Sequence, residues 1–361
     1  MDRTGTAMSC PHGNNPSPPL CSFVPPHFLK AVAESPEVPR QAREAAARTL
    51  AIDNNIRQVR PARLEEADHA PDAAAAGAPN RKIYDCKGTR DLPGTLIRKE
   101  NDGITVKDRA INNAYDGLGI TFNFFSTIFG RKSIDNASLP LVGSLHYDQD
   151  YNNAFWDGRQ MVFGDGDGIY FDYLSDSLDV IVHELTHGVV QYSARLEYQD
   201  QAGALNESVA DAFACMAEQW HFGQTAEQGD WILGQNLFPV ARKGVALRSL
   251  KAPGTAYKDP LGKDPQVAHM RDFVKTEEDN GGVHINSGIP NHAFYLAAVG
   301  LGGRSWERAG QIWYRSLTDG RVKPNSTFKE FAELTVDNAQ KVFGDSVTKV
   351  VKDSWASVGV L

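Results

Sequence analysis

The sequence has little cysteine, no long hydrophobic run and no excess of positive charge. Four of its 361 residues are cysteines, and their irregular spacing argues against a disulfide scaffold in a chain of this size. A stretch of about twenty apolar residues, which a transmembrane helix needs, is missing. The formal net charge is −8 and no basic stripe is visible, so nucleic acid is not an expected partner.

The first residues also lack the charged and then apolar pattern of an ordinary signal peptide. We therefore expect a protein that is either cytoplasmic or secreted by a non-conventional route. At 361 residues the chain is long enough for two domains around a large core. No internal repeat is apparent, and we expect a monomer.

Residues 1–60 differ in composition from the rest of the chain. The first twenty are rich in Pro, Gly, Ser and Asn and indicate coil, whereas alanines at helical spacing predict a helix over about 39–59. The prolines and the alanine run of residues 61–80 are typical of a linker. Short β-rich runs follow within 81–198, and helical patterns dominate 199–361.

The most informative motif is His183-Glu184-Leu-Thr-His187, which lies inside an apolar run. Two histidines four residues apart share one face of a helix, so both imidazoles can reach one ion. An open zinc site takes three protein ligands and a water, and Glu184 lies close enough to accept a proton from that water. The alternative is a buried amphipathic helix whose histidines only form hydrogen bonds, because five letters can match by chance.

A second predicted helix carries Glu207 and Asp211, which are again four residues apart and share a face. One carboxylate can bind the metal while the other holds a ligand histidine by its second ring nitrogen. A solvated acidic face is the alternative. However, the neighbouring residues are Leu, Val, Ala, Phe and Met, among which unpaired acids are rare. This pattern favours zinc.

In these two predicted helices, the chain resembles the thermolysin-type metallopeptidases, and the resemblance runs from about Ile83 to the C-terminus. The resemblance also rests on Asn153-Ala-Phe-Trp156, on Gly164-Asp-Gly-Asp-Gly168 and on the run that begins at Asp279-Asn-Gly-Gly-Val-His284. The short leader with Pro25-Pro26 is most similar to the protealysin-like branch. The resemblance implies an α+β fold with two lobes. A β-rich N-terminal catalytic lobe and an α-helical C-terminal lobe would lie on either side of the zinc helix.

The resemblance also implies roles for particular residues. The zinc ligands would be His183, His187 and Glu207, with Asn206 and Asp211 orienting the two histidines. Beside the general base, four residues would act on the reacting peptide bond or position a group that does: Tyr198, Arg248, Asp279 and His284. Asn153 and Ala154 would hold the substrate backbone like an added strand. The pocket for the residue after the cut, S1′, would be lined by Phe171, Leu174, Val180, Leu233 and Leu247.

For the leader, the resemblance implies a propeptide, residues 1–60, that inhibits its own enzyme until it is cut off near 61–80. A plain N-terminal extension is the alternative. A thiolate is a strong zinc ligand, so Cys21 could cap the zinc in the uncut chain. Cys21 could equally be a small buried apolar residue, and Cys10 is a weaker candidate for the cap. If the cap is real, Cys21→Ala should expose activity in the uncut chain.

Calcium is where the sequence departs from longer-known family members. Asp179, Glu218 and Asp230 match calcium-binding carboxylates, but Ile232 and Gln235 stand where two further acids are expected. A pair of divalent ions needs several anionic oxygens, so we expect one calcium ion at most. The Gly164–Gly168 run begins like a calcium loop but lacks its later ligands. We expect a hairpin turn there.

The predicted function is that of a zinc-dependent neutral endopeptidase that is made as a zymogen. It would cut peptides on the N-terminal side of bulky hydrophobic residues. Two alternatives are a catalytically silent pseudopeptidase that serves as a binding module and a zinc hydrolase of non-peptide substrates. A binding module has no need of the general base Glu184. A non-peptide substrate has no need of Asn153 or Arg248.

Overall fold

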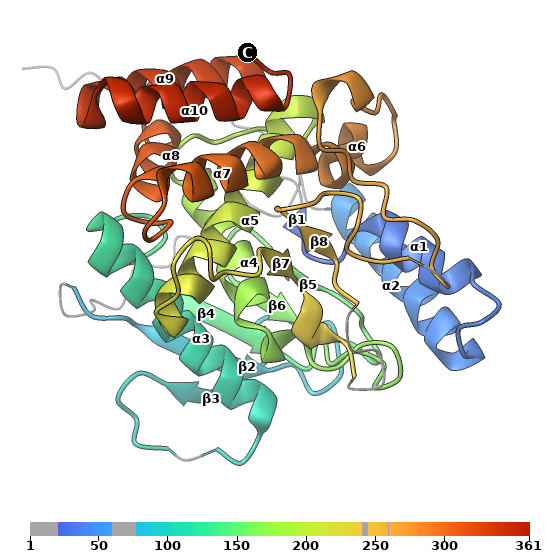
Figure 1. Cartoon of the computed structure of the whole chain (residues 1–361). Helices are drawn as coiled ribbons and strands as arrows, with labels where there is room; N and C mark the ends of the chain where they lie inside the picture. The colour runs from blue at the N-terminus through green and yellow to red at the C-terminus, as the bar shows by residue number, and fades with distance from the viewer. Residues whose placement is uncertain (1–20, 60–76, 105, 240–244, 259) are drawn as a thin grey trace, which may run out of the picture.

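The computed structural model describes residues 21–59, 77–104, 106–239, 245–258 and 260–361. Figure 1 shows a mixed sheet in the lower half of the molecule and a group of helices above it, with two further helices of the leader at one side. The central helices α4 and α5 lie between the sheet and the C-terminal helices. This is the predicted two-lobed α+β architecture.

The N-terminal lobe is built on a six-stranded sheet in the order β1-β5-β6-β4-β2-β3. The central strand β4 runs parallel to both of its neighbours, β2 and β6, and the remaining pairs are antiparallel. The strands are β1 (Cys21–Ser22), β2 (Arg81–Asp85), β3 (Thr95–Lys99), β4 (Leu141–Leu145), β5 (Ala154–Trp156) and β6 (Met161–Phe163).

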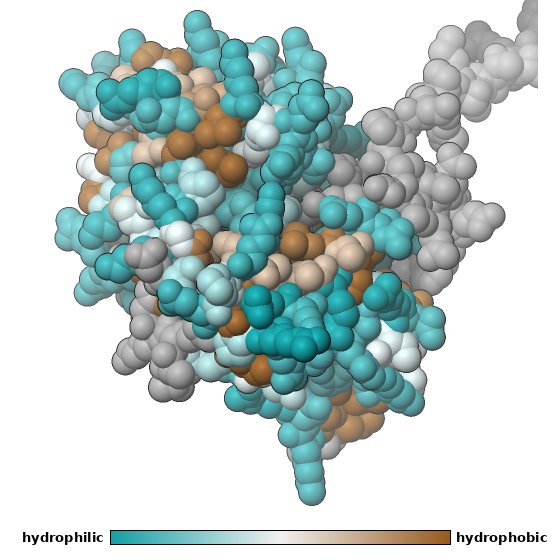
Figure 2. All heavy atoms as spheres, turned by 90° about the vertical axis from the view of Figure 1, so that its right-hand side faces the viewer, coloured by the Kyte–Doolittle hydropathy of each residue, from teal (hydrophilic) through white to brown (hydrophobic). Residues whose placement is uncertain are grey.

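The edge strand β1 belongs to the leader, although its partner β5 lies more than a hundred residues away in sequence. Helices α1 (Pro26–Glu34) and α2 (Arg40–Val59) follow it, close to the predicted helical pattern. Ala42, Ala45 and Ala46 of α2 are fully buried. The side of the molecule on which α1 and α2 lie is mostly hydrophilic, with separate hydrophobic patches (Figure 2). The leader helices therefore pack their apolar side chains against the rest of the chain.

Three helices form the middle layer: α3 (Arg109–Phe129), α4 (Leu178–Gln191) and α5 (Asp200–Phe222). Helix α3 begins at Asp108, whose carboxylate accepts a hydrogen bond from the Ile111 backbone N–H at 3.1 Å, and ends at the left-handed Gly130. Helix α5 likewise ends at a left-handed glycine, Gly223. Nearly every residue of α4 is buried, as expected for a helix enclosed between a sheet and a second layer of helices.

The C-terminal lobe contains α6 (Asp279–Asn286), α7 (Gly288–Leu301), α8 (Ala309–Leu317), α9 (Phe328–Phe343) and α10 (Asp345–Ser357). A small two-stranded sheet, β7 (Ile232–Leu233) and β8 (Arg248–Ser249), borders it. The expected capping pattern opens α9, because Thr327 and Glu330 form a reciprocal capping box. In the core, the indoles of Trp313 and Trp355 stack with their centroids 5.8 Å apart.

One local prediction is wrong. The Gly164–Gly168 run joins no two strands of a hairpin, because β6 leads through it to the 3₁₀ turn η2 (Leu174–Asp176). Instead, the Asp167 carboxylate accepts backbone hydrogen bonds from the next residues, among them Ile169 at 2.8 Å. Most of the predicted linker and Cys10 lie outside the described residues. Among the residues that the structure describes, no helix is long and apolar enough to cross a membrane.

Candidate active site

Helix α4 presents the His-Glu-x-x-His motif to the interior, where all three side chains are buried. The Nε2 atoms of His183 and His187 lie 3.0 Å apart. Glu207 of α5 completes the group, with one carboxylate oxygen 3.5 Å from His183 Nε2 and the other 3.4 Å from His187 Nε2. We call His183, His187 and Glu207 the ligand cluster. Ligand atoms of a tetrahedral zinc ion at about 2.0–2.1 Å lie roughly 3.3 Å from one another. The three separations fit such an ion.

The hydrogen-bond partners of the two imidazoles support this reading. His187 Nδ1 lies 2.9 Å from Asn206 Oδ1, and the Asn206 amide is oriented by its donation to the Leu196 carbonyl at 3.2 Å. His183 Nδ1 lies 2.8 Å from Asp211 Oδ1. Both partners are acceptors, so each Nδ1 carries the proton and each Nε2 keeps a lone pair. Two lone pairs and a carboxylate then face one another in the buried interior, an arrangement that suits a cation.

Glu184 lies beside the ligand cluster and is held by the sheet. Its Oε2 accepts a hydrogen bond from the Trp156 backbone N–H of β5 at 2.8 Å. Its Oε1 is buried and has no hydrogen-bond partner in the protein. Burial raises the pKa of Glu184 well above the ordinary range, and the neighbouring Glu207 adds to the rise. A carboxylate with one anchored and one available oxygen, and with a raised pKa, suits proton transfer.

His284 approaches the ligand cluster from the C-terminal lobe on a loop that folds back as predicted. Asp279 Oδ1 lies 2.7 Å from His284 Nδ1, and Asp279 Oδ2 accepts the His284 backbone N–H at 2.9 Å. The reversal needs left-handed backbone at Gly281 (φ 83°) and Gly282 (φ 73°), which glycine adopts without a Cβ clash. Burial disfavours the imidazolium, but Asp279 and Glu207 outweigh this and raise the pKa of His284.

Tyr198 and Arg248 complete the surroundings of the cluster. The Tyr198 hydroxyl donates a hydrogen bond to Glu207 and lies 3.3 Å from His284 Nε2. Arg248 of β8 is fully buried and binds Asp211 through Nε and Nη2 at 2.9 Å each. Burial disfavours the ionised carboxylate, but the charges of Arg248 and His183 lower the pKa of Asp211. Asp211 thus links a ligand histidine to a buried guanidinium.

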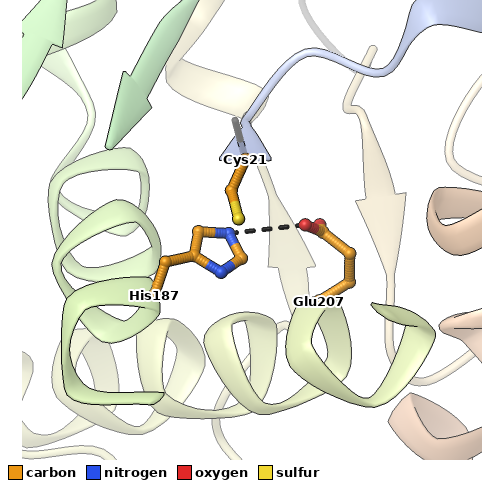
Figure 3. Close-up of side chains that lie close together, drawn as sticks. All are labelled: Cys21, His187 and Glu207. Carbon is orange, nitrogen blue, oxygen red and sulfur yellow. Dashed lines mark ion pairs between the residues drawn. The ribbon is translucent and has the colours of Figure 1, made fainter. Parts of the chain in front are cut away.

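The leader occupies the space in front of this cluster, which sequence analysis had foreseen only for Cys21. Figure 3 shows Cys21 descending from β1 toward His187 of α4 and Glu207 of α5. Potential ligand atoms of these three side chains all lie within 4.8 Å of one another. The adjacent Ser22, Phe23 and Val24 were missed. A bulky apolar residue directly before a Pro-Pro turn was the available signal, but no local pattern reveals a contact with residues so distant in sequence.

The predicted backbone-binding residues hold the leader. Asn153 Oδ1 accepts the Val24 N–H at 2.8 Å, and Asn153 Nδ2 donates to the Val24 carbonyl at 3.1 Å. The Ala154 carbonyl accepts the Phe23 N–H at 3.0 Å. Sequence analysis missed two residues that hydrogen-bond to predicted site residues, one in the leader and one in the C-terminal lobe. Asp53 of α2 accepts from Asn153 Nδ2 at 2.9 Å, and Asn291 of α7 donates to Asp211 at 2.9 Å.

The five predicted pocket residues all belong to the main hydrophobic core and are essentially unexposed. Phe171 packs against Phe28 of the leader helix α1, with ring centroids 5.8 Å apart. The Tyr257 ring also contacts the Phe28 ring edge-on, with ring centroids 4.9 Å apart. The remaining four are Leu174, Val180, Leu233 and Leu247. The assignment of these side chains to S1′ stays a prediction.

Two of the three predicted calcium ligands, Asp179 and Asp230, already accept hydrogen bonds from the backbone. We call Asp179, Glu218 and Asp230 the acidic cluster. In the described part of the chain, groups of three potential ligands converge only around the ligand cluster. The Asp179 carboxylate already accepts hydrogen bonds from Ser177 Oγ, from the Val180 N–H at 2.7 Å and from the Gly234 N–H at 2.6 Å.

At the edge of the acidic cluster, Asp230 faces an amide in place of a cation. Gln235 Nε2, which stands where a further acid was expected, lies 3.4 Å from Asp230 Oδ2. Burial raises the pKa of Glu218 to about 8, with Asp179 and Asp230 adding to the rise. The assignment of these three carboxylates to a calcium ion stays a prediction.

Two histidines and a glutamate that converge beside a buried carboxylate, between two lobes, define a metal-dependent hydrolase. Family models match almost the whole chain outside the leader. Residues 63–191 match the catalytic domain of thermolysin metallopeptidases, and residues 194–360 match their α-helical domain. The chain therefore belongs to the thermolysin family of metallopeptidases, and it is a metalloendopeptidase.

Individual relatives extend the similarity to the leader. An extracellular metalloprotease of Pectobacterium carotovorum subsp. carotovorum is 47% identical over 346 residues, 95% of this chain and 97% of the relative. Protease PrtS of a Photorhabdus strain is 47% identical over 296 residues, covering 81% of this chain and 80% of that protein. The solved precursor of protealysin from Serratia proteamaculans matches 94% of this chain and 100% of its own, with a TM-score of 0.85 and 45% identity.

Proposed function

We propose that this metalloendopeptidase is zinc-dependent, is made as a zymogen and cleaves peptides on the N-terminal side of bulky hydrophobic residues. One observation carries the proposal: residues 22–24 of the leader lie along β5 as a peptide substrate would, directly in front of the ligand cluster. The match to the solved protealysin precursor supports the zymogen state. The relative named an extracellular metalloprotease supports action outside the cell.

Zinc fits the donor set, because two imidazole nitrogens and one carboxylate oxygen form the three-ligand site of catalytic zinc. When bound, zinc would supply Lewis acidity to the scissile carbonyl and lower the pKa of water. Asn206 and Asp211 would hold His187 and His183 in the required tautomer, and such partners typically change metal affinity about 10–100-fold. The chain's own residues must then bind the peptide, orient it and move protons.

The proton transfers fall to Glu184. Its available Oε1 would take the proton of the attacking water and deliver it to the leaving amine. The negative charge that develops on the peptide oxygen needs donors. In the zymogen His284 Nε2 lies 3.1 Å from the Ser22 carbonyl oxygen, with the Tyr198 hydroxyl 3.3 Å from the same nitrogen. A donor of this kind typically contributes about 3 kcal/mol to the transition state.

Substrate orientation falls to Asn153, Ala154 and Arg248. Arg248 Nη1 donates to the Phe23 carbonyl at 2.8 Å while its other nitrogens stay on Asp211. The Phe23 side chain is fully buried, edge-on to the His183 ring at 5.0 Å and under the Arg248 guanidinium at 4.6 Å. A bulky apolar side chain directly after the reacting bond would occupy this position, which supports the proposed specificity. These peptide contacts and the general base disfavour both a silent binding module and a non-peptide hydrolase.

The leader would silence the enzyme by filling the cleft and by placing the Cys21 thiol at the ligand cluster. The test of the cap uses the full chain with Glu184→Gln and cobalt(II) in place of zinc. A thiolate ligand gives cobalt a charge-transfer absorption, which Cys21→Ala should abolish while Cys215→Ala leaves it unchanged. Cys215 is also a buried thiol but lies outside the cluster. Identical spectra with and without Cys21 would reject the cap.

The test of the function uses the zinc-loaded protein after the leader has been removed by limited proteolysis within residues 61–80. Casein and a furylacryloyl-dipeptide amide should be hydrolysed, a chelator should abolish the reaction and Glu184→Gln should reduce kcat by about 10²–10⁴ or more. Glu218→Gln, a matched change of a glutamate outside the site, should retain activity. A preference for a charged residue after the cut would contradict the proposed specificity.

A further inference from the structure

The leader crosses the cleft in the register of a substrate. β1 pairs antiparallel with β5, with Cys21 opposite Trp156 and Ser22 opposite Phe155. The ladder continues past the strand, because the Phe23 N–H donates to the Ala154 carbonyl at 3.0 Å. Added-strand pairing of this kind fixes which peptide bond faces the catalytic residues.

The peptide bond between Ser22 and Phe23 is held on both of its sides. The Ser22 carbonyl oxygen lies 3.1 Å from His284 Nε2, and the Phe23 carbonyl accepts from Arg248 Nη1 at 2.8 Å. The next residue, Val24, is bound through both its N–H and its carbonyl by Asn153. An oriented bond with a donor at its carbonyl is close to the geometry that a reaction requires.

What separates this segment from an ordinary substrate is Cys21, the second residue before the bond. The Cys21 side chain reaches the ligand cluster, where its sulfur competes for the space in front of His187 and Glu207 (Figure 3). Glu184 stands ready on the other side, with an Oε1 that no protein group occupies. The thiol therefore blocks a site in which every other contact favours hydrolysis.

We propose that the leader is a latent substrate of the site that it blocks, and that the Ser22–Phe23 peptide bond is hydrolysed when the Cys21 thiol no longer reaches the ligand cluster. This inference rests on the proposed function. Water adds across the bond, so a C–O bond forms at the Ser22 carbonyl as the C–N bond to Phe23 breaks. Glu184 takes one proton from the water and passes it to the new Phe23 amine. No oxidant or other reactant is required.

The cut would release residues 1–22 and leave the rest of the leader in place. Phe28 remains inserted between Phe171 and Tyr257, at 5.8 Å and 4.9 Å between ring centroids. Asp53 of α2 continues to accept hydrogen bonds from Tyr151 at 2.5 Å and from Asn153 at 2.9 Å. The shortened leader has lost its thiol and one side of its strand. We expect it to inhibit less strongly than the intact leader.

The experiment follows the intact mass and the N-terminal residue of the zinc-loaded full chain over time. Cys21→Ala should lose residues 1–22 and acquire Phe23 as its N-terminus, at least tenfold faster than the unmodified chain. The rate should not depend on protein concentration, because the bond lies in its own molecule's cleft. Cys21→Ala combined with Glu184→Gln should stay intact. Adding Phe23→Gly to Cys21→Ala should slow the cut at least tenfold by removing the buried ring.

Cys21→Ser serves as a second variant, and thermal unfolding of each variant establishes that it folds. If Cys21→Ala and Cys21→Ser fold and keep the Ser22–Phe23 bond while the leader-free enzyme hydrolyses added peptides, the inference is wrong and the proposed function stands. If the leader-free enzyme hydrolyses no peptide, the proposed function fails first. Cleavage that becomes faster in proportion to protein concentration would also overturn the inference, because it would occur between molecules.

Discussion

The ligand cluster and the acidic cluster each draw at least one residue from α4 and one glutamate from α5. His183 and Glu207 belong to the first, and Asp179 and Glu218, four residues earlier on α4 and eleven later on α5, belong to the second. Burial alone would raise the pKa of Glu207 in the first cluster and of Asp179 and Glu218 in the second. Around Glu207, the charges of His284, His187 and His183 outweigh burial and lower the pKa.

Around Glu218 no positive charge contributes, so burial and the two aspartates raise its pKa to about 8. Asp179 shows the same direction, because burial outweighs the hydrogen bonds from Ser177, Gly234 and Val180. The comparison teaches that a buried carboxylate is anionic only where the fold supplies basic groups. The first cluster surrounds its glutamate with basic groups that lower its pKa, whereas around Glu218 of the second cluster burial and carboxylates raise it.

The largest effect should follow from Asp211→Asn, which removes the anion that links the ligand cluster to Arg248. The buried guanidinium would lose its partner, and breaking a buried pair typically costs about 3–5 kcal/mol of stability. Loss of the acceptor at His183 Nδ1 should lower zinc affinity about 10–100-fold. Chemical denaturation and zinc competition measure the two quantities.

Asp319→Asn is the matched control for this prediction. Asp319 also binds an arginine through two nitrogens, Arg321 Nη2 at 2.6 Å and Nε at 2.9 Å, but at the surface. Exposed pairs contribute little to stability. A loss of stability at Asp319 as large as that at Asp211 would show that burial is not the deciding factor.

A smaller effect should follow from Glu218→Gln, which replaces the retained proton by an amide. The folded pKa of about 8 lies above the ordinary value of 4.5, so the folded state keeps a proton that the unfolded state loses. Stability must therefore fall as pH rises between about 4.5 and 8. Glu218→Gln should remove this slope and stabilise the protein by about 1–3 kcal/mol at pH 7.5.

Denaturation of the Glu184→Gln protein at pH 5.5 and 7.5 provides the measurement without self-digestion. Glu227→Gln, a change at an exposed glutamate, is the matched control and should leave the pH slope in place. If Glu218→Gln lowers stability at pH 7.5, the carboxylate is ionised in the fold and the contrast between the two clusters is lost.

Features that depend on local spacing along the chain could be predicted from the sequence. His183, His187 and Glu184 follow from helical spacing alone, because the backbone places them whatever the tertiary fold does. The second helix offered Glu207 and Asp211 at the same spacing, and only the resemblance assigned Glu207 as the ligand. The two-lobed fold and the fold-back of His284 onto Asp279 followed from the resemblance and from local glycines.

Contacts between distant segments could not be predicted. Nothing local to Phe23 indicates that its carbonyl meets Arg248, 225 residues away. The hairpin expected at Gly164–Gly168 was wrong because Asp167 satisfies several backbone N–H groups by itself. The calcium ligands were predicted from residue identity alone. The sequence does not show which N–H groups donate hydrogen bonds to these carboxylates. In the structure, the Gly234 N–H donates to Asp179, 55 residues away in sequence.

His27 of the leader sharpens the comparison, because it is a base that becomes buried when α1 docks. Its Nδ1 is buried without a hydrogen-bond partner. Burial lowers the pKa of His27 to about 4, with His284 and Arg248 adding to the fall and Asp279 opposing it. The docked histidine must be neutral, whereas the undocked one titrates near 6.5. Docking is therefore strongest above pH 6.5 and weakens as pH falls toward 4.

Hydrogen exchange of the α1 amides in the Glu184→Gln chain, corrected for intrinsic rates, measures this opening. Between pH 7 and 5.5 the opening constant should rise roughly tenfold. His27→Leu should lack that rise. Equal pH dependence in both proteins would mean that other groups, such as Asp279, control docking.

The smallest effect should come from calcium. A site occupied at a hundred times its Kd would add about 2.7 kcal/mol to the free energy of unfolding, which amounts to several degrees in Tm. The acidic cluster offers no such site, since Asp179 is saturated by donors and Asp230 faces the Gln235 amide. Tm of the zinc-loaded Glu184→Gln protein should therefore be the same in millimolar calcium and after calcium-selective chelation. Ile232→Glu combined with Gln235→Glu restores the two acids that the sequence replaces, and this variant should acquire a calcium-dependent Tm. A calcium-dependent Tm in the unmodified chain would place a cation where the structure has a proton.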